Sequence, residues 1–246
     1  RGGGSGWVGG RGAMGCGGGA GPGSLGGTRR AVVVAVIGGR FGAGVPSTKI
    51  VIWDRHLTDL RLAGFGDVAE RFHVRLAAAV TEGFDPATFY DSAIPGSLVW
   101  GDLEFEKKGA GVGRKSFISN LVSKQLTAII DITPLLNHNQ AGVAGHLATL
   151  TMASIDNSMR FESQTDRLST ALPELYALPA VGDKVVLNIT DALIAQYQGE
   201  QRSLLHYSTV LDQLWFSKDP VALDVLSIQE LDRQRRSAGV ESQNTA

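Results

Sequence analysis

Apolar and polar positions along this chain form blocks whose lengths predict strands alternating with helices. Three runs are apolar at most positions and rich in β-branched residues: 49–53 (KIVIW), 126–133 (LTAIIDIT) and 184–194 (KVVLNITDALI). Such runs are typical of strands buried on both faces. Helical periodicity and end signals predict helices at 29–42, 66–82, 142–154, 169–177 and 219–236.

This alternation predicts the α/β class, with a mostly parallel sheet flanked by helices in a single domain. The domain is expected at 28–236, with short strands near SLVWGDLEFE (97–106) and a helical or irregular segment at 116–125. Residues 1–27 are mostly glycine and have few side chains to bury, so we expect a disordered tail that contributes nothing to the fold. Residues 237–246 are expected to be a frayed polar tail.

Composition excludes several classes of function. The formal net charge of -1 provides no general attraction to nucleic acid, and no apolar run approaches the ~18–20 residues of a membrane helix. The single cysteine, Cys16, cannot hold an iron–sulfur cluster on this chain or form an internal disulfide. We therefore expect neither nucleic acid nor a membrane as partner, and favour a small-molecule ligand.

Each of the three predicted strands carries an aspartate at or near its carboxyl end: Asp54, Asp131 and Asp191. Because ligands bind at the carboxyl ends of parallel strands, these carboxylates are expected to share one rim. Carboxylate oxygens suit a divalent cation, so Asp54 and Asp191 are candidate metal ligands and candidate catalytic groups. The alternative is that each aspartate caps the next element or begins a turn.

The segment 137–162 (NHNQAGVAGHLATLTMASIDNSMRFE) gathers polar groups around a short apolar run. His138 is a candidate catalytic residue in a loop, and His146 shares a helix face with Val143 and Leu150, where a core histidine is the alternative. The start of this helix is a candidate anion site. The remaining candidate ligand-binding residues are Arg55, Asn139, Asp156, Asn157, Arg160 and, on the last predicted helix, Asp224.

Asp224 follows Val221 and precedes Val225 and Ile228 at helical spacing, which places it on a predicted apolar stripe. A carboxylate there must be hydrogen-bonded, paired or protonated. At the start of this helix Asp219 suits the N-cap position and Pro220 the first turn.

Four blocks resemble the domain of unknown function 362 family of bacteria and archaea: AGVPSTKIVIWDR with DLRLAGF, NHNQAGVAGHLATLTMASIDN with Arg160, LNITDAL, and SKDPVALDV. The resemblance covers residues 31 to about 236. It implies an α/β fold and an association with iron–sulfur systems, whose cysteine-rich segment this chain lacks. Members tend to carry lysines where this chain has Leu136 and Ala148, which puts transfer of their activity in doubt.

Three hypotheses follow. The first is a metal-assisted enzyme with an Asp/His/Asn/Arg site. The second is a non-catalytic protein that binds a small anion through Arg55, Arg160 and a helix start. The third is an accessory protein that docks on a redox partner. Thr28-Arg29-Arg30 resembles a twin-arginine export motif, with a plain helix start as the alternative, so the full-length protein is expected to be cytoplasmic or exported by that route.

Overall fold

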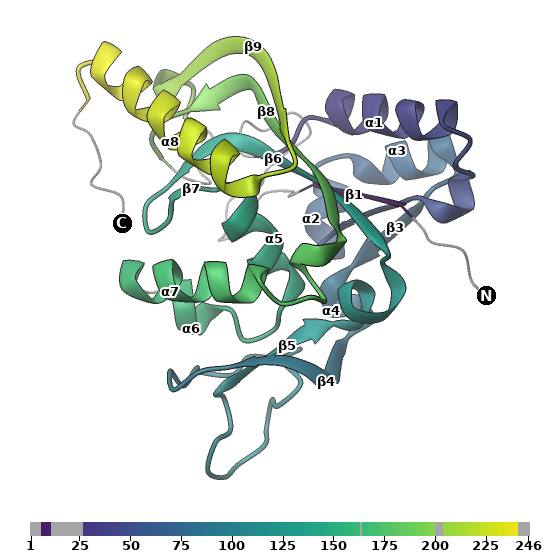
Figure 1. Cartoon of the computed structure of the whole chain (residues 1–246), viewed down its shortest axis with the longest axis vertical. Helices are drawn as coiled ribbons and strands as arrows, with labels where there is room; N and C mark the ends of the chain where they lie inside the picture. The colour runs from purple at the N-terminus through teal and green to yellow at the C-terminus, as the bar shows by residue number, and fades with distance from the viewer. Residues whose placement is uncertain (1–5, 11–26, 163, 200–203, 241–246) are drawn as a thin grey trace.

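The computed structural model describes residues 6–10, 27–162, 164–199 and 204–240. A central sheet has the strand order β3-β2-β1-β6-β8-β9, and the short β7 pairs with β6 (Figure 1). Neighbours from β3 to β8 are parallel, whereas β9 and β7 are antiparallel to their partners. The strands are β1 (Gly6–Gly10), β2 (Val51–Asp54), β3 (Arg75–Ala78), β6 (Ala128–His138), β7 (Gly142–Val143), β8 (Val185–Gln196) and β9 (Ser208–Ser217).

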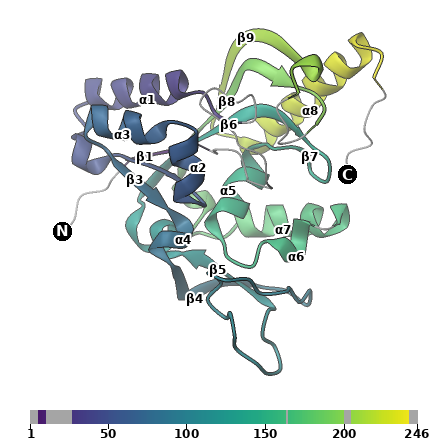
Figure 2. The same cartoon turned by 180° about the vertical axis from the view of Figure 1, so that it is seen from behind.

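The α/β class is confirmed, but the layout is more varied than predicted. The central sheet is mixed, and a separate antiparallel pair joins β4 (Phe84–Asp91) to β5 (Lys115–Ser119). The long connection between β4 and β5 projects from the body of the molecule (Figures 1 and 2).

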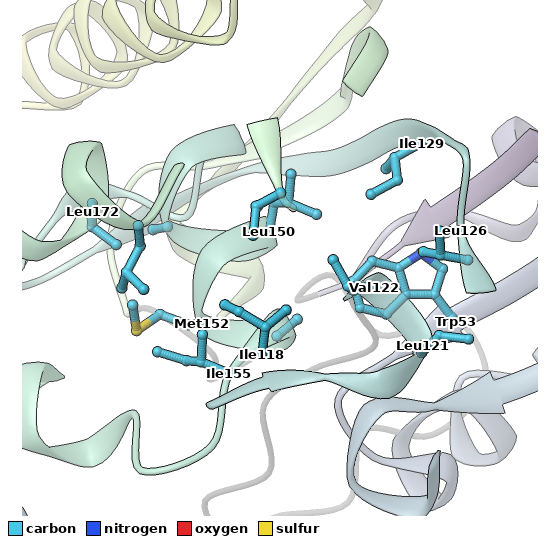
Figure 3. Packing of buried hydrophobic residues seen from close by; sticks show 14 of the residues in the cluster. Trp53, Ile118, Leu121, Val122, Leu126, Ile129, Leu150, Met152, Ile155 and Leu172 are labelled. Carbon is cyan, nitrogen blue, oxygen red and sulfur yellow. The ribbon is translucent and has the colours of Figure 1, made fainter. Parts of the chain in front are cut away.

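Helices cover both faces of the central sheet. On one face α1 (Arg30–Gly42) and α3 (Phe65–Phe72) pack against alternate strand residues such as Ile52, Ile130 and Ile132. On the other face α5 (His146–Ser154) and α7 (Thr165–Tyr176) enclose a cluster that includes Trp53 and Ile129 (Figure 3). Three short helices complete this part: α2 (Leu57–Leu62), α4 (Ala79–Glu82) and α6 (Met159–Glu162).

The last helix, α8 (Pro220–Ser237), packs beside the extended ends of β6, β8 and β9 (Figure 1). Its start agrees with the prediction, since the Asp219 side chain accepts from the Ala222 amide and Pro220 occupies the first turn. The predicted apolar stripe is only partly correct: Asp224 is buried, but Val221 and Val225 are 51% and 47% exposed. Leu223 and Leu231 are the apolar residues that this helix buries.

The glycine-rich N-terminal segment provides a central strand. β1 lies between β2 and β6 and pairs in parallel with both. The prediction that residues 1–27 contribute nothing to the fold is therefore wrong for 6–10, because pairing on both sides outweighs the low strand propensity of glycine. Residues 1–5 and 11–26, which include Cys16, lie outside the described residues, as do 241–246 of the expected C-terminal tail.

Two further differences concern element type. The predicted helix 66–82 is interrupted after α3 by His73, whose φ of 51° is left-handed, and the chain then forms β3 and α4. Pairing of β3 with β2 overrides the helical propensity of its alanines. The predicted strands near 97–106 are turns, and β9 was missed. Within the described ranges, no helix has the length and hydropathy that crossing a bilayer requires.

Candidate functional site

Three polar side chains from different elements meet at the N-terminal end of α5. His146 Nδ1 lies 2.7 Å from Asp131 Oδ2, and His146 Nε2 lies 3.0 Å from Thr190 Oγ1. The hydroxyl of Thr133 is 3.5 Å from the same Nε2. All these residues are at most 2% exposed. We call Asp131, His146 and Thr190 the relay cluster.

Strand alternation and register bring the relay cluster together. Asp131 lies between Ile130 and Ile132, which face α1 and α3, so its carboxylate points to the α5 side of the sheet. Thr190 is on the neighbouring strand β8, directly across from Thr133 of β6. His146 is the first residue of α5, so the start of this helix delivers the imidazole to the sheet surface.

A second carboxylate, from α8, fixes the position of α5. Asp224 Oδ1 accepts from the His146 amide at 2.7 Å, and its Oδ2 accepts from the Leu147 amide at 3.0 Å. Burial raises the pKa of Asp224, whereas the charge of His146 and the two amides lower it. Gly145 makes this approach possible, because a Cβ there would stand 2.1 Å from Asp224 Oδ1.

Three separate sequence blocks converge at this point. NHNQAGVAGHLATL contributes His146, LNITDAL contributes Thr190, and SKDPVALDV contributes Asp224. These residues are far apart in the chain, yet His146 makes contact with both of the others. Residues from three separate parts of the sequence are thus in contact at and beside the relay cluster.

The order carboxylate–imidazole–hydroxyl has defined chemical properties. A carboxylate on Nδ1 orients the ring and favours the tautomer with its proton on that nitrogen. Nε2 is then free to accept the proton of the Thr190 hydroxyl, which would make the threonine oxygen more nucleophilic. The Asp131–His146–Thr190 geometry provides these three groups in that order.

A second polar group lies at the other end of α5. Arg55 Nη1 donates to the carbonyls of Met152 and Ile155, at 2.7 and 2.5 Å. Burial lowers the pKa of Arg55, and nearby carboxylates oppose that effect, those of Glu162 and Asp102 most strongly. A cation at the C-terminal end of a helix is favourable because the free carbonyls carry partial negative charge.

Asp156 follows α5 and belongs to this second group. Its oxygens accept from the amides of Leu103, at 2.8 Å, and Phe117, at 2.6 Å. Burial raises the pKa of Asp156 to about 6, although both amides lower it. The structure therefore brings together the predicted site residues Arg55 and Asp156, and Asn157 follows Asp156 in the chain.

The expected rim of three aspartates does not form. Asp191 pairs with Arg29, whose Nη1 lies 2.9 Å from Oδ1 and whose amide donates to Oδ2 at 2.8 Å. Asp54 accepts from the Arg55 amide at 2.6 Å. The two aspartates stand on β2 and β8, which are separated by β1 and β6, and three strand spacings amount to roughly 14 Å. Asp131 points to the opposite face.

The predicted metal site shared by Asp54 and Asp191 must therefore be corrected, because the two carboxylates do not meet. Among the described residues, no three His, Cys, Asp or Glu side chains are grouped so that they could hold a metal ion. The alternative stated for the aspartates, a local role at a turn, fits Asp54, which accepts from the next amide. The pairing of Asp191 with Arg29 instead joins distant parts of the chain. It also gives Arg29 of the Thr28-Arg29-Arg30 motif a structural role.

His138 and Asn139 lie apart from the relay cluster and shape their own turn. His138 Nδ1 accepts from the amides of Gln140 and Ala141, at 3.2 and 3.0 Å. Asn139 Oδ1 accepts from Asn137 Nδ2 at 3.2 Å. These contacts close the hairpin between β6 and β7, so the structure favours a local role over the catalytic one expected for His138.

The groups expected to bind an anion are occupied by the protein itself. The first amides of α5 bind Asp224. Arg160 donates to the Ser116 hydroxyl and to the carbonyls of Ile94, Arg114 and Tyr90. Its guanidinium also lies 4.4 Å from the ring centroid of Phe161, and burial lowers its pKa to about 10. Arg160 of α6 thus joins β4, β5 and the connection between them.

Sequence reasoning missed Thr190 and undervalued Asp131. Asp131, like Asp191, lies inside a predicted strand, a position that costs stability unless the carboxylate finds a partner. That signal was available from the sequence. Thr190 carries no comparable signal, because a threonine in a strand is ordinary. A comparison with protein-family models, curated proteins and solved structures finds no match.

Proposed function

We propose that this protein is an enzyme of the domain of unknown function 362 type, in which His146 acts as a general base on the Thr190 hydroxyl. The observation that carries the proposal is the contact of His146 with a carboxylate on one ring nitrogen and a hydroxyl on the other. Its expected ligand is a small molecule bound near the carboxyl ends of the parallel strands of the sheet.

In the proposed step, His146 Nε2 takes the proton of Thr190 as its oxygen attacks an electrophilic carbon or phosphorus atom. The proton then passes from the imidazolium to the leaving group. Asp131 stabilises the imidazolium by accepting from Nδ1. His146 is 0% and Thr190 1% exposed, so a substrate reaches them only after α8, which holds α5 through Asp224, moves away.

The first experiment tests the nucleophile. The full chain is incubated with a reactive organophosphonate ester, and the labelled residue is located by peptide mass spectrometry. We expect an adduct on Thr190 in the natural protein and on the serine in Thr190→Ser. Thr190→Val and His146→Gln should lose it. Thr133→Val is the matched control, because Thr133 lies farther from Nε2, at 3.5 Å, and should leave labelling intact.

Two results would contradict the proposal. One is a folded natural protein that acquires no adduct at Thr190. The other is labelling that persists at the natural rate in a folded His146→Gln variant. Circular dichroism and a cooperative melting transition establish folding in each variant, so that loss of structure is not mistaken for loss of chemistry.

A ligand screen separates catalysis from simple binding. Carboxylated and phosphorylated metabolites are tested by thermal shift on the full chain. A ligand at 100 times its dissociation constant adds about 2.7 kcal/mol to the free energy of unfolding. An anion that stabilises the natural protein and Thr190→Val equally, without any adduct in the first experiment, would favour the non-catalytic binding function.

A docking role on a redox partner has one observation in its favour. The connection between β4 and β5 exposes apolar side chains, with Trp100 82%, Val99 42% and Phe105 38% exposed. Exposed tryptophan is frequent at protein interfaces. If that role is correct, Trp100→Ala should weaken the binding of a ferredoxin-type protein to the full chain, measured by titration calorimetry. An unchanged affinity with Trp100→Ala would argue against it.

A further inference from the structure

The connection between β4 and β5 forms a closed loop whose ends meet at two glycines. The Gly96 amide donates to the Gly113 carbonyl at 2.9 Å. Gly113 has a φ of 81°, and a Cβ there would stand 2.8 Å from the Gly96 carbonyl oxygen. We call residues 96–113 the clasp loop. Its middle, 105–111, is exposed and projects outward (Figures 1 and 2).

Two carboxylates fasten the clasp loop in a reciprocal way. Asp102, within the loop, accepts from the Asn157 amide at 2.9 Å. Asp156, on the body, accepts from the Leu103 amide at 2.8 Å. Each aspartate thus binds the backbone of the residue that follows the other. Asp102 is 8% and Asp156 1% exposed, so two acidic groups are buried close together.

Among the described residues, the charges that act on this pair from outside the clasp loop come from two places, the end of β2 and α6. Arg55 at the end of β2 and Arg160 of α6 provide positive charge near Asp156. The carboxylates of Glu162 and Asp54 also interact with the positive charge of Arg55, so this charge does not serve Asp156 alone. Because burying a charged carboxylate is costly unless its charge is compensated, ionisation of Asp156 favours its return to water.

We propose that Asp102 and Asp156 form a pH-sensitive latch, which holds the clasp loop closed in acid and releases it when Asp156 is ionised. Release would uncover Arg55 and Asp156 at the carboxyl end of β2, where parallel sheets bind ligands. The inference does not depend on the relay cluster, which lies at the other end of α5.

The direction of the effect follows from linkage. In the closed state burial raises the pKa of Asp156 to about 6, and the neighbouring Asp102 acts in the same direction. In the open state the carboxyl regains water, and its pKa returns toward 3.8. The closed state therefore binds the proton more tightly, so acid favours closure. As pH rises through about 6 that preference is lost.

Hydrogen exchange at the Leu103 amide tests the latch in the full chain. After correction for the intrinsic rate, the protection factor should fall by about 25-fold between pH 4.5 and 7.5, given the two pKa values. The fall should disappear in Asp156→Asn. Asp91→Asn is the matched control, because Asp91 is a half-exposed carboxylate at the base of the same connection and should leave the fall unchanged.

A second measurement uses the natural protein alone, in case Asp156→Asn does not fold. The side-chain carboxyl carbon of Asp156 is titrated by NMR together with the Leu103 amide proton. Both should move with one midpoint near pH 6. A Leu103 protection factor that is independent of pH, or a carboxyl midpoint below pH 4.5, would overturn the proposal.

Discussion

At the residue scale, Gly145 shows how one position sets the geometry of the relay cluster. It precedes His146, and the space that a side chain would fill is taken by Asp224 Oδ1. Asp224 in turn accepts from the first two amides of α5. The absence of one carbon atom therefore lets α8 dock on α5.

We expect Gly145→Ala to lower the free energy of unfolding by about 1–3 kcal/mol, because it displaces the cap and leaves buried amides unsatisfied. Urea denaturation measures this. Gly38→Ala is the control: Gly38 is exposed on α1 with no atom within 4 Å of an added Cβ. That change should be neutral or stabilising, by up to about 1 kcal/mol. Equal stability of the two variants would contradict this account of the cap.

At the element scale, β1 joins two halves of the central sheet. Its parallel pairing connects β2 and β3 on one side with β6 and β8 on the other. Without it, β2 and β6 would each present an unpaired edge in the middle of the fold, where backbone groups have no water to replace the lost hydrogen bonds.

Removal of residues 1–10 should therefore abolish cooperative unfolding or lower the melting temperature strongly, since both inner edges lose their partner. Removal of residues 1–5 is the control, because it leaves β1 in place. Calorimetry and circular dichroism on the two shortened chains measure the difference. Indistinguishable melting curves would show that β1 contributes little to stability.

At the scale of the whole molecule, Asp156 makes stability depend on pH. Its pKa is about 6 in the folded protein and 3.8 without the protein environment, so the folded state binds this proton more tightly. Its contribution is favourable in acid and is lost as pH rises from about 4 to 6. The difference corresponds to about 3 kcal/mol, as an upper bound.

Denaturation of the natural protein and of Asp156→Asn across pH 4 to 7 tests this contribution. The natural protein should lose stability relative to the variant as pH rises through this range. Asp85 is a useful contrast, because the Ala87 amide lowers its pKa to about 2, and its contribution is lost only in stronger acid. A stability difference that is constant from pH 4 to 7 would contradict the raised pKa of Asp156.

The sequence by itself determined the elements whose residues act locally. The apolar runs at β2, β6 and β8 and the start of α8 follow from composition and spacing, because burial and capping involve neighbouring positions. Helical periodicity also predicted that Asp224 is buried, although Val221 and Val225 of the same predicted stripe are exposed.

Only the tertiary structure decided which of the polar residues meet. Asp131 and Asp191 have similar places in their strands, yet one faces His146 and the other Arg29, because alternation and register point them to opposite faces. Likewise, the glycine-rich segment 6–10 forms a strand because it pairs with β2 and β6, which are distant in the chain. Pairing between distant segments depends on contacts that no local pattern records, and those contacts assembled the relay cluster and the latch.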